Sequence, residues 1–232
     1  HSFHNSASGR PSNIRWRVTV TLGDLMHTVL HEALSRSPVM PVLVIPEISM
    51  AAPLAEALAA GGLTVFEITL RTDCALDAMV AMKRVVPEAL IGAGTVTNAH
   101  RMREAKEYGA DFVVSPGTTQ ALWNAGMEHQ LPILPGFSSA SEAMALMELG
   151  SHCGKFFPAE ASGGVNYLKS LAGPLPDFLV CPTGGIKAET AGNYLACPNV
   201  VCVGGSWIAP GDLLAEGDYV EIEARARFAA SL

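Results

Sequence analysis

The sequence predicts an α/β protein: a (β/α)8 TIM barrel in a single domain, with an extra helix at its N-terminal side. Short apolar segments alternate with segments of helical periodicity, the pattern of a parallel sheet covered by helices. The chain has 232 residues and is 49% hydrophobic, which is enough for one barrel with one large core. Glycines and capping residues such as Asn98 and Ser139 fall between the two kinds of segment, where the chain must turn.

Eight apolar segments are predicted to be strands, and helical segments follow them. The strands are expected at 39–45, 63–70, 90–94, 111–115, 131–135, 154–158, 178–182 and 199–203. The helices are expected at 50–60, 75–86, 99–108, 120–128, 140–149, 165–171, 187–195 and 219–230, and the extra helix at 23–35. A doubly wound open sheet is the alternative, and the lack of a G-x-G-x-x-G motif weighs against it.

Residues 1–20 differ from the rest of the chain in being polar and without clear periodicity. They are expected to form a disordered tail, which leaves 21–232 as the barrel domain. The tail has no apolar core of the kind that a secretory signal requires.

Composition limits the classes of partner. The formal net charge is −7 and no Lys/Arg run occurs, so nucleic acid is not an expected partner. No apolar stretch is long enough to span a membrane, so no membrane partner is expected either. The five cysteines lack C-x-x-C spacing and indicate reduced thiols and a cytoplasmic location, with no disulfide framework and no metal site.

A lysine interrupts the apolar strand predicted at 154–158. Strand periodicity places Lys155 and Phe157 on one face and Phe156 on the other. A buried parallel strand is normally hydrophobic on both faces, so a lysine there is costly. Because burial disfavours the charged form of a lysine and exposes a nucleophilic amine, the hypothesis is that Lys155 forms a Schiff base with a carbonyl substrate. The alternative is a strand-end lysine whose ammonium reaches solvent or a carboxylate.

The second predicted strand has a polar face. Glu67, Thr69 and Arg71 alternate with apolar residues that must pack against helices, so the polar face should turn into the barrel. A carboxylate inside a barrel needs a partner, and Lys155 is the candidate across the interior. The alternative is a contact between Glu67 and Arg71, but positions four apart on a strand are about 13 Å apart.

Several further strand ends carry turn residues that suit a binding site. Gly92 and Gly94, which precede Thr95, would let a ligand approach the backbone. The turns at Ser115-Pro116-Gly117 and Pro135-Gly136 either line a pocket or only connect elements. The pairs Gly184-Gly185 and Gly204-Gly205, the second followed by Ser206, come after the last two strands, where such barrels commonly bind phosphate.

Together these residues predict a mechanism that needs neither a metal nor an organic cofactor. Lys155 would attack a ketone, and the iminium would act as the electron sink for cleavage of a carbon–carbon bond while Glu67 moves protons. Arg71 would suit a carboxylate and the paired glycines a phosphate. Two other classes stay open: a phosphate-binding isomerase that uses acid–base chemistry alone, and a catalytically silent barrel used for binding or assembly.

The same segments resemble the family of 2-keto-3-deoxy-6-phosphogluconate (KDPG) and 4-hydroxy-2-oxoglutarate (KHG) aldolases from about residue 37 to the C-terminus. The motifs that carry the resemblance are EITLRT at 67–72, GAGTV at 92–96, SPG at 115–117, KFFPAE at 155–160, CPTGGI at 181–186 and GGSW at 204–207. The resemblance implies a class I aldolase of the Entner–Doudoroff pathway. Its substrate would be a phosphorylated keto-deoxy sugar acid, cleaved to pyruvate and glyceraldehyde 3-phosphate, and KHG is a second expected substrate.

The resemblance also implies roles for individual residues. Lys155 matches the Schiff-base lysine and Glu67 the general acid/base. Substrate contacts are implied for Arg71, Thr95, Pro116, Phe157, Gly184, Gly185, Gly205 and Ser206. A homotrimer is implied as well. The related phosphogalactonate aldolases are the alternative within this group, and they tend to differ at three of these motifs. Ile45-Pro46-Glu47 departs from many relatives, which carry a polar or basic residue there, and this could alter substrate selectivity.

Overall fold

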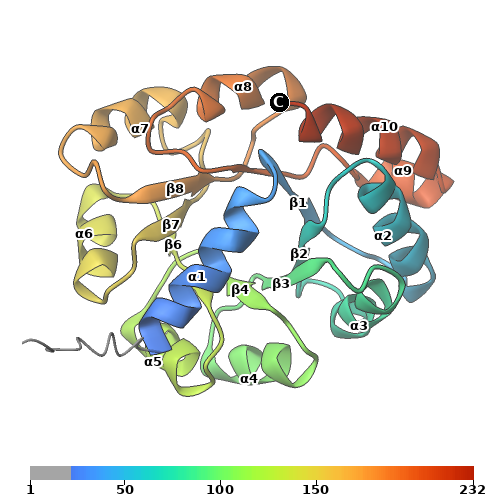
Figure 1. Cartoon of the computed structure of the whole chain (residues 1–232), viewed down its shortest axis with the longest axis horizontal. Coiled ribbons are helices and arrows are strands. Elements are labelled where there is room, and N and C mark those ends of the chain that lie inside the picture. Colours follow the sequence, from blue (N-terminus) through green and yellow to red (C-terminus); the bar gives the residue numbers. More distant parts are fainter. Residues whose placement is uncertain (1–21) are drawn as a thin grey trace, which may run out of the picture.

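Parallel strands form the centre of the molecule and helices surround them in the computed structural model, which describes residues 22–232 (Figure 1). The strands are β1 (Val39–Leu43), β2 (Val65–Thr69), β3 (Leu90–Gly94), β4 (Phe112–Val114), β5 (Ile133–Leu134), β6 (Gly136–Phe137), β7 (Cys153–Phe156), β8 (Leu179–Pro182) and β9 (Val203–Gly205). The helices are α1 (Leu22–Ser35), η1 (Ile48–Met50), α2 (Ala51–Ala60), α3 (Ala75–Val85), α4 (Ala99–Glu107), α5 (Gln120–Glu128), α6 (Ala140–Glu148), α7 (Gly164–Ala172), α8 (Ala188–Leu195), α9 (Gly211–Glu216) and α10 (Tyr219–Ala230). The tail expected at 1–20 lies outside the described residues.

The strands form a curled parallel sheet. Hydrogen bonds join β5-β4-β3-β2-β1-β9 in one part and β6-β7-β8 in the other. Isolated parallel bridges, Val180 with Val200 and Thr183 with Gly204, link the β8 region to the β9 region. The α/β class is therefore confirmed, whereas complete closure into a (β/α)8 barrel stays a prediction.

Most elements begin or end within a few residues of the expected positions, and the larger differences concern the fifth and the last strand. The fifth strand is divided into β5 and β6 because Pro135 lies between them and has no N–H to donate to a ladder. The last strand lies at Val203–Gly205 and not at 199–203, since the preceding residues pair with the β8 region only through the bridge at Val200. Helix α9 was not expected.

Two predicted helix caps are present. The side chain of Asn98 accepts a hydrogen bond from the backbone N–H of Arg101 at the start of α4. Ser139 and Glu142 form a reciprocal capping box at the start of α6. Because Glu142 accepts hydrogen bonds from Ser138 and Ser139, its pKa lies below the ordinary value. These side chains satisfy backbone donors that the first helical turn leaves unpaired.

Two apolar clusters stabilise the fold. The larger lies between the strands and the surrounding helices and includes Phe66, Ile68 and Phe156. The smaller lies on the inner side of the curled sheet beneath α1, which crosses the strands in Figure 1. Its buried members are Leu30, Ala33, Leu34, Met40, Val65, Phe112, Val114, Leu134, Cys153, Cys181 and Cys202. Apolar side chains and thiols therefore occupy much of the interior at the α1 end.

No helix within residues 22–232 combines the length and the hydropathy that crossing a membrane requires.

Candidate active site

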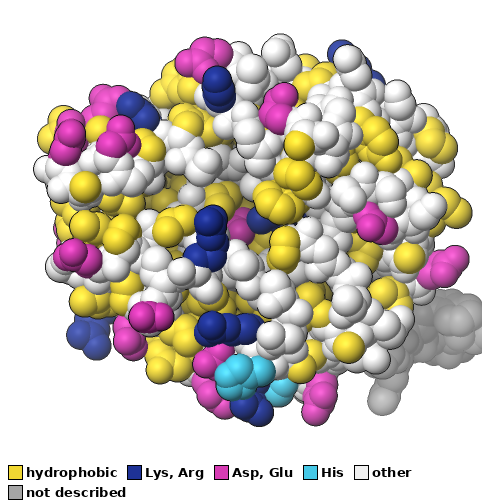
Figure 2. Space-filling view, turned by 180° about the vertical axis from the view of Figure 1, so that it is seen from behind, with side chains coloured by type: hydrophobic (Ala, Val, Ile, Leu, Met, Phe, Trp, Pro, Cys, Tyr) yellow, Lys and Arg dark blue, Asp and Glu magenta, His cyan; other side chains and the backbone are white. Residues whose placement is uncertain are grey.

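The polar residues of the interior lie toward the carboxyl ends of the strands, away from α1. Val65, Glu67 and Thr69 alternate along β2, and Val65 belongs to the inner apolar cluster, so Glu67 and Thr69 follow it on the same face. Cys153 and Lys155 alternate in the same way along β7. Figure 2 shows the face opposite to Figure 1, where Lys/Arg and Asp/Glu side chains come together near the centre. The polar layer therefore lies directly above an apolar one.

Lys155 and Glu67 form a buried ion pair. The Lys155 Nζ donates to Oε1 of Glu67 at 3.0 Å and to Oε2 at 3.3 Å. Lys155 is only 5% exposed and Glu67 is fully buried. The carboxylate expected to face the lysine across the interior is therefore in direct contact with it. The alternative pairing along β2 is wrong, because both oxygens of Glu67 accept from Lys155 and no hydrogen bond or ion pair within residues 22–232 joins Glu67 to Arg71.

The glycines of β3 have a different use from the expected one. A Cβ at Gly94 would overlap the carboxylate of Glu67, and a Cβ at Gly92 would overlap the ring of Phe112. Protein side chains therefore occupy the space that was expected for a ligand. Gly94 makes room for the Glu67 carboxylate beside Lys155.

Thr95 follows β3 in a strained backbone conformation. Its φ is 61°, in the left-handed region that is a true outlier for a β-branched residue. Such strain costs about 1–3 kcal/mol and occurs most often at functional sites. The Arg71 side chain is exposed at the end of β2, and no hydrogen bond or ion pair within residues 22–232 holds its guanidinium. Arg71 follows β2 and Thr95 follows β3. Because these two strands pair in parallel, both residues lie at the same carboxyl edge of the sheet.

Phe157 connects the lysine to the turn after β8. The Lys155 Nζ lies 5.3 Å from the centroid of the Phe157 ring, within the range of a cation–π interaction. The same ring would lie 3.3 Å from a Cβ at Gly184. On the other side of β7, Lys155 pairs in register with Gly136, whose α-carbon packs against the backbone of Pro116. Phe157, Pro116 and the Gly184 turn thus lie around the lysine.

The two glycine pairs serve different physical purposes. Gly184 and Gly185 have φ values of +105° and +80°, conformations that other residues rarely adopt. Gly204 and Gly205 lie in β9 and permit close packing, since a Cβ at Gly204 would overlap Thr183 and one at Gly205 would overlap the Trp207 ring. Only the first pair therefore forms a left-handed turn of the kind that aims backbone N–H groups at an anion.

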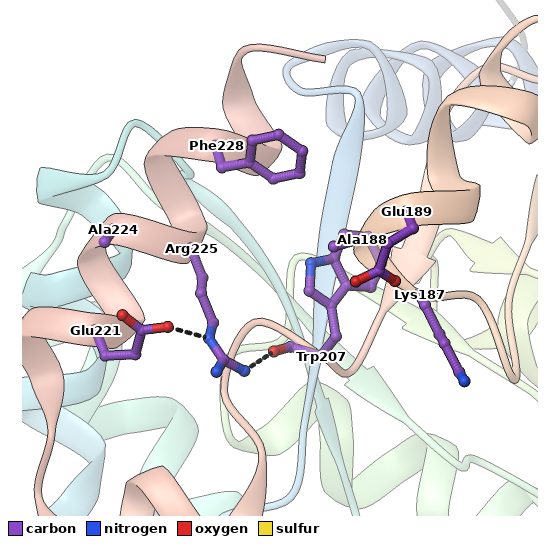
Figure 3. Close-up of a pocket in the computed structure, with 8 residues that line it drawn as sticks. All are labelled: Lys187, Ala188, Glu189, Trp207, Glu221, Ala224, Arg225 and Phe228. Atoms are coloured by element: carbon purple, nitrogen blue, oxygen red, sulfur yellow. Dashed lines mark hydrogen bonds and ion pairs between the residues drawn. The ribbon is translucent and has the colours of Figure 1, made fainter.

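A hydrogen bond from α10 holds the turn formed by Gly205, Ser206 and Trp207. Arg225 donates from Nη1 to the Trp207 carbonyl at 2.9 Å and from Nε to Glu221 at 2.7 Å, and Figure 3 shows the guanidinium between these two acceptors. A cavity of about 510 Å³ lies beside this turn. Its lining residues are Lys187, Ala188, Glu189, Trp207, Glu221, Ala224, Arg225 and Phe228. Ser206 is exposed and follows β9 directly, at the carboxyl end of the sheet.

Three thiols lie below the ion pair. Cys202 donates to the sulfur of Cys181 at 3.5 Å, and Cys153 belongs to the same cluster. Burial, and secondarily the neighbouring Cys181, raises the pKa of Cys153 to about 12. The hydrogen bond with Cys181, followed by burial, raises the pKa of Cys202 well above its usual value. All five cysteines are free, and no group of three potential metal ligands occurs in the described part of the chain.

Two features of the site were missed from the sequence. Thr183 is buried directly after β8, two residues after the inward-facing Cys181, and this spacing could have identified it. Glu160 accepts a hydrogen bond from the Tyr194 hydroxyl at 2.6 Å, a contact between the β7 end and α8 that no local pattern indicates.

The fold and the buried pair define a class of protein, an α/β enzyme in which a lysine amine and a carboxylate meet at the carboxyl ends of parallel strands. The model of the KDPG and KHG aldolase family matches residues 30–225. The KHG/KDPG aldolase of Escherichia coli K12 is 48% identical over 200 residues, covering 86% of this chain and 94% of the relative. The chain therefore belongs to the KDPG and KHG aldolase family, and it is a carbon–carbon lyase.

Solved structures agree with this assignment. A KDPG aldolase from Legionella pneumophila, with pyruvate captured at low pH as a covalent carbinolamine, is 40% identical with a TM-score of 0.83, covering 90% of this chain and 98% of that one. The KDPG aldolase of Zymomonas mobilis ZM4 with 3-phosphoglycerate is 45% identical with a TM-score of 0.84, covering 89% and 96%.

Proposed function

We propose that this aldolase cleaves KDPG to pyruvate and glyceraldehyde 3-phosphate through a Schiff base on Lys155, with Glu67 as the general acid/base. The observation that carries the assignment of residues is the contact between the buried Lys155 amine and the buried Glu67 carboxylate. The carbinolamine in the Legionella pneumophila relative supports the covalent chemistry. The Entner–Doudoroff pathway follows from the family.

The proposed reaction starts with proton transfer from Lys155 to Glu67, which frees the amine electron pair. The amine adds to the C2 ketone to give a carbinolamine, and the protonated Glu67 gives its proton to the departing hydroxyl, so that loss of water leaves an iminium and an ionised Glu67. Glu67 then takes the proton of the C4 hydroxyl as the C3–C4 bond breaks, and the electron pair of that bond moves into the iminium to form an enamine. The aldehyde leaves, the enamine is protonated at C3, and water releases pyruvate from Lys155.

The ends of the substrate are assigned to two groups of residues. Arg71 and Thr95 would bind the carboxylate, since the guanidinium suits a planar anion and no described partner occupies it. Gly184, Gly185, Gly205 and Ser206 would bind the phosphate through backbone N–H groups and a hydroxyl. Phe157 and Pro116 would form walls between the two ends, which agrees with their positions beside Lys155 and Gly136.

KHG is the second proposed substrate, because the name of the Escherichia coli relative includes it. KHG has no phosphate, so it separates the two ends of the site. Ser206→Ala is expected to raise the KM for KDPG on the order of tenfold and to leave the KM for KHG within about twofold. Equal effects on the KM values of both substrates would show that Ser206 does not bind the phosphate.

Borohydride reduction in the presence of pyruvate tests the central assignment. The reduced adduct should map by mass spectrometry to Lys155, and Lys155→Ala should give no adduct. An isomerase that uses acid–base chemistry alone, or a silent barrel, would gain no covalent mass. An adduct on another lysine would overturn the role of Lys155 but not the class of reaction.

The proposal extends to a single barrel domain, closed between β5 and β6 through Pro135 and between β8 and β9 through the isolated bridges. It also includes a homotrimer in the cytoplasm. Free cysteines agree with a reducing compartment, and exposed apolar side chains such as Val220, Met144 and Phe228 offer surface for subunit contacts. Light scattering coupled to size-exclusion chromatography measures the mass of the assembly, and a monomer would contradict the trimer.

A further inference from the structure

The turn at Gly184-Gly185 needs support from outside its own backbone. Both glycines have a positive φ in the folded protein. Because glycine restricts the backbone least, the same two residues can adopt many other conformations in an unfolded chain. The turn lies between β8 and α8, and the N–H groups it offers to an anion are useful only in one arrangement. The residues that fix the turn therefore affect anything bound there.

The segment after β7 supplies the first part of this support. The Ala159 N–H donates to the Thr183 carbonyl at 2.8 Å, and the Glu160 N–H donates to the Gly184 carbonyl at 3.1 Å. These bonds continue the β7–β8 pairing beyond both strands. A Cβ at Gly185 would lie 2.8 Å from Cβ and Cγ of Glu160, so the turn packs directly on the Glu160 side chain.

The second part comes from α8, the helix that the turn enters. Tyr194 on α8 is only 1% exposed, and its hydroxyl donates to Oε1 of Glu160 at 2.6 Å. A hydrogen bond to a carboxylate is about twice as strong as one between neutral groups. Burial, and then the Glu160 hydrogen bond, raises the pKa of Tyr194, so the hydroxyl stays protonated and donating at neutral pH. The turn therefore packs on Glu160, Glu160 is bonded to Tyr194 of α8, and α8 follows the turn.

We infer that Glu160 and Tyr194 are positioning residues, which hold the Gly184-Gly185 turn in the geometry that receives the substrate phosphate. Neither residue is assigned a contact with substrate. The inference depends on the proposed phosphate end of the site. It predicts a specific failure: loss of the Tyr194–Glu160 bond weakens binding of phosphorylated ligands and spares the Lys155 chemistry.

Tyr194→Phe removes only the hydroxyl and leaves the ring in the core. We expect its KM for KDPG to rise on the order of tenfold, with kcat/KM for KHG within about twofold of the parent. Inorganic phosphate, used as a competitive inhibitor of KDPG cleavage, should inhibit more weakly by a similar factor. Borohydride trapping of pyruvate should be unchanged. Glu160→Ala should reproduce the pattern, and Glu160→Gln should restore most of the KM because the amide oxygen can accept the same hydrogen bond.

Tyr167→Phe is the matched control. Tyr167 lies on α7 and its hydroxyl accepts from the Ala140 N–H at 3.1 Å, away from the turn, so its loss should not separate KDPG from KHG. Equal losses for both substrates in Tyr194→Phe, or no change in KM and phosphate inhibition, would overturn the inference. If Tyr194→Phe does not fold, Glu160→Ala and Glu160→Gln decide the question. Failure of the proposed function would appear differently, as a parent protein that neither cleaves KDPG nor traps pyruvate.

Discussion

Lys155 on β7 and Glu67 on β2 lie 88 positions apart in the chain, yet the Lys155 amine contacts both oxygens of the Glu67 carboxylate. The strands β2 and β7 lie in different parts of the sheet, so only the curvature of the fold brings the two side chains together. Each removes the cost of burying the other's charge, and each is available for proton transfer to the other.

Glu67→Gln tests the proton transfers. The amide keeps the shape of the side chain but cannot accept a proton, so kcat for KDPG cleavage should fall on the order of 10²–10⁴-fold. Trapping of pyruvate by borohydride should remain detectable, although slower. Turnover close to that of the parent protein would show that another group moves the protons.

Lys155→Met tests the energetics of the pair. The substitution leaves the Glu67 carboxylate buried without its cation, so the free energy of unfolding should fall by about 3–5 kcal/mol at neutral pH. Adding Glu67→Gln should recover much of the loss, because the second change removes the isolated charge. Urea titration measures both effects, and an additive double variant would mean that the two charges do not interact.

Gly94→Ala tests the space reserved for Glu67. The added methyl group would overlap the carboxylate, so we expect a loss of about 1–3 kcal/mol in stability together with a large loss of kcat. Gly192→Ala is the control, because Gly192 lies in α8 with no atom within 4 Å of the added methyl group. It should raise stability by about 0.4–1 kcal/mol and leave kcat unchanged. Normal kcat in Gly94→Ala would contradict the close fit.

Arg225→Met tests the support of the Trp207 carbonyl. It should lower the free energy of unfolding by about 1–3 kcal/mol, because a partly buried carbonyl loses its charged donor. Arg227→Met on the same helix removes an exposed ion pair with Glu223 and should cost no more than about 1 kcal/mol. Thermal and urea unfolding of the two variants compare the contributions, and equal losses would mean that the Trp207 contact adds nothing.

The buried thiols predict a loss of stability in alkali. The pKa of Cys153 is raised to about 12 in the folded chain, above the value of about 8.5 for a free thiol. Above about pH 8.5 the unfolded chain therefore loses a proton that the folded chain keeps, and stability should fall as pH rises toward the folded pKa. Each such thiol contributes a slope of about 1.4 kcal/mol per pH unit.

Cys153→Ala should reduce this slope by one thiol's contribution. Urea unfolding at several pH values between about 8 and 10 gives the slope directly, independently of any constant change in stability. The same slope in Cys153→Ala and the parent protein would contradict the raised pKa.

Regular alternation made much of the fold and the central pair predictable. Apolar residues on one side of β2 require the other side to face inward, so Glu67 had to meet a partner in the interior, and Lys155 was the cation on a matching strand. The caps at Asn98 and Ser139 were predictable because both ends of each contact lie within one helical turn.

Contacts between distant segments were not predictable in the same way. The space beside Gly92 and Gly94 is filled by Phe112 and Glu67, which belong to neighbouring strands, and a glycine alone does not indicate what fills the space. Likewise, the bond from Tyr194 to Glu160 depends on how α8 packs, and no residue pattern marks it. Pro135 divides the fifth strand into β5 and β6. The sequence contained this proline, but the apolar residues before it predicted one continuous strand.

The apolar and thiol side chains beneath the ion pair affect the route by which substrate and products would reach and leave Lys155. Buried residues such as Phe112, Leu134 and Cys181 form an apolar layer between the ion pair and α1. In the proposed reaction, substrate and products would therefore enter and leave on the side of the ion pair away from α1. Because pyruvate stays attached to the proposed nucleophile until hydrolysis, the aldehyde would leave first and pyruvate second.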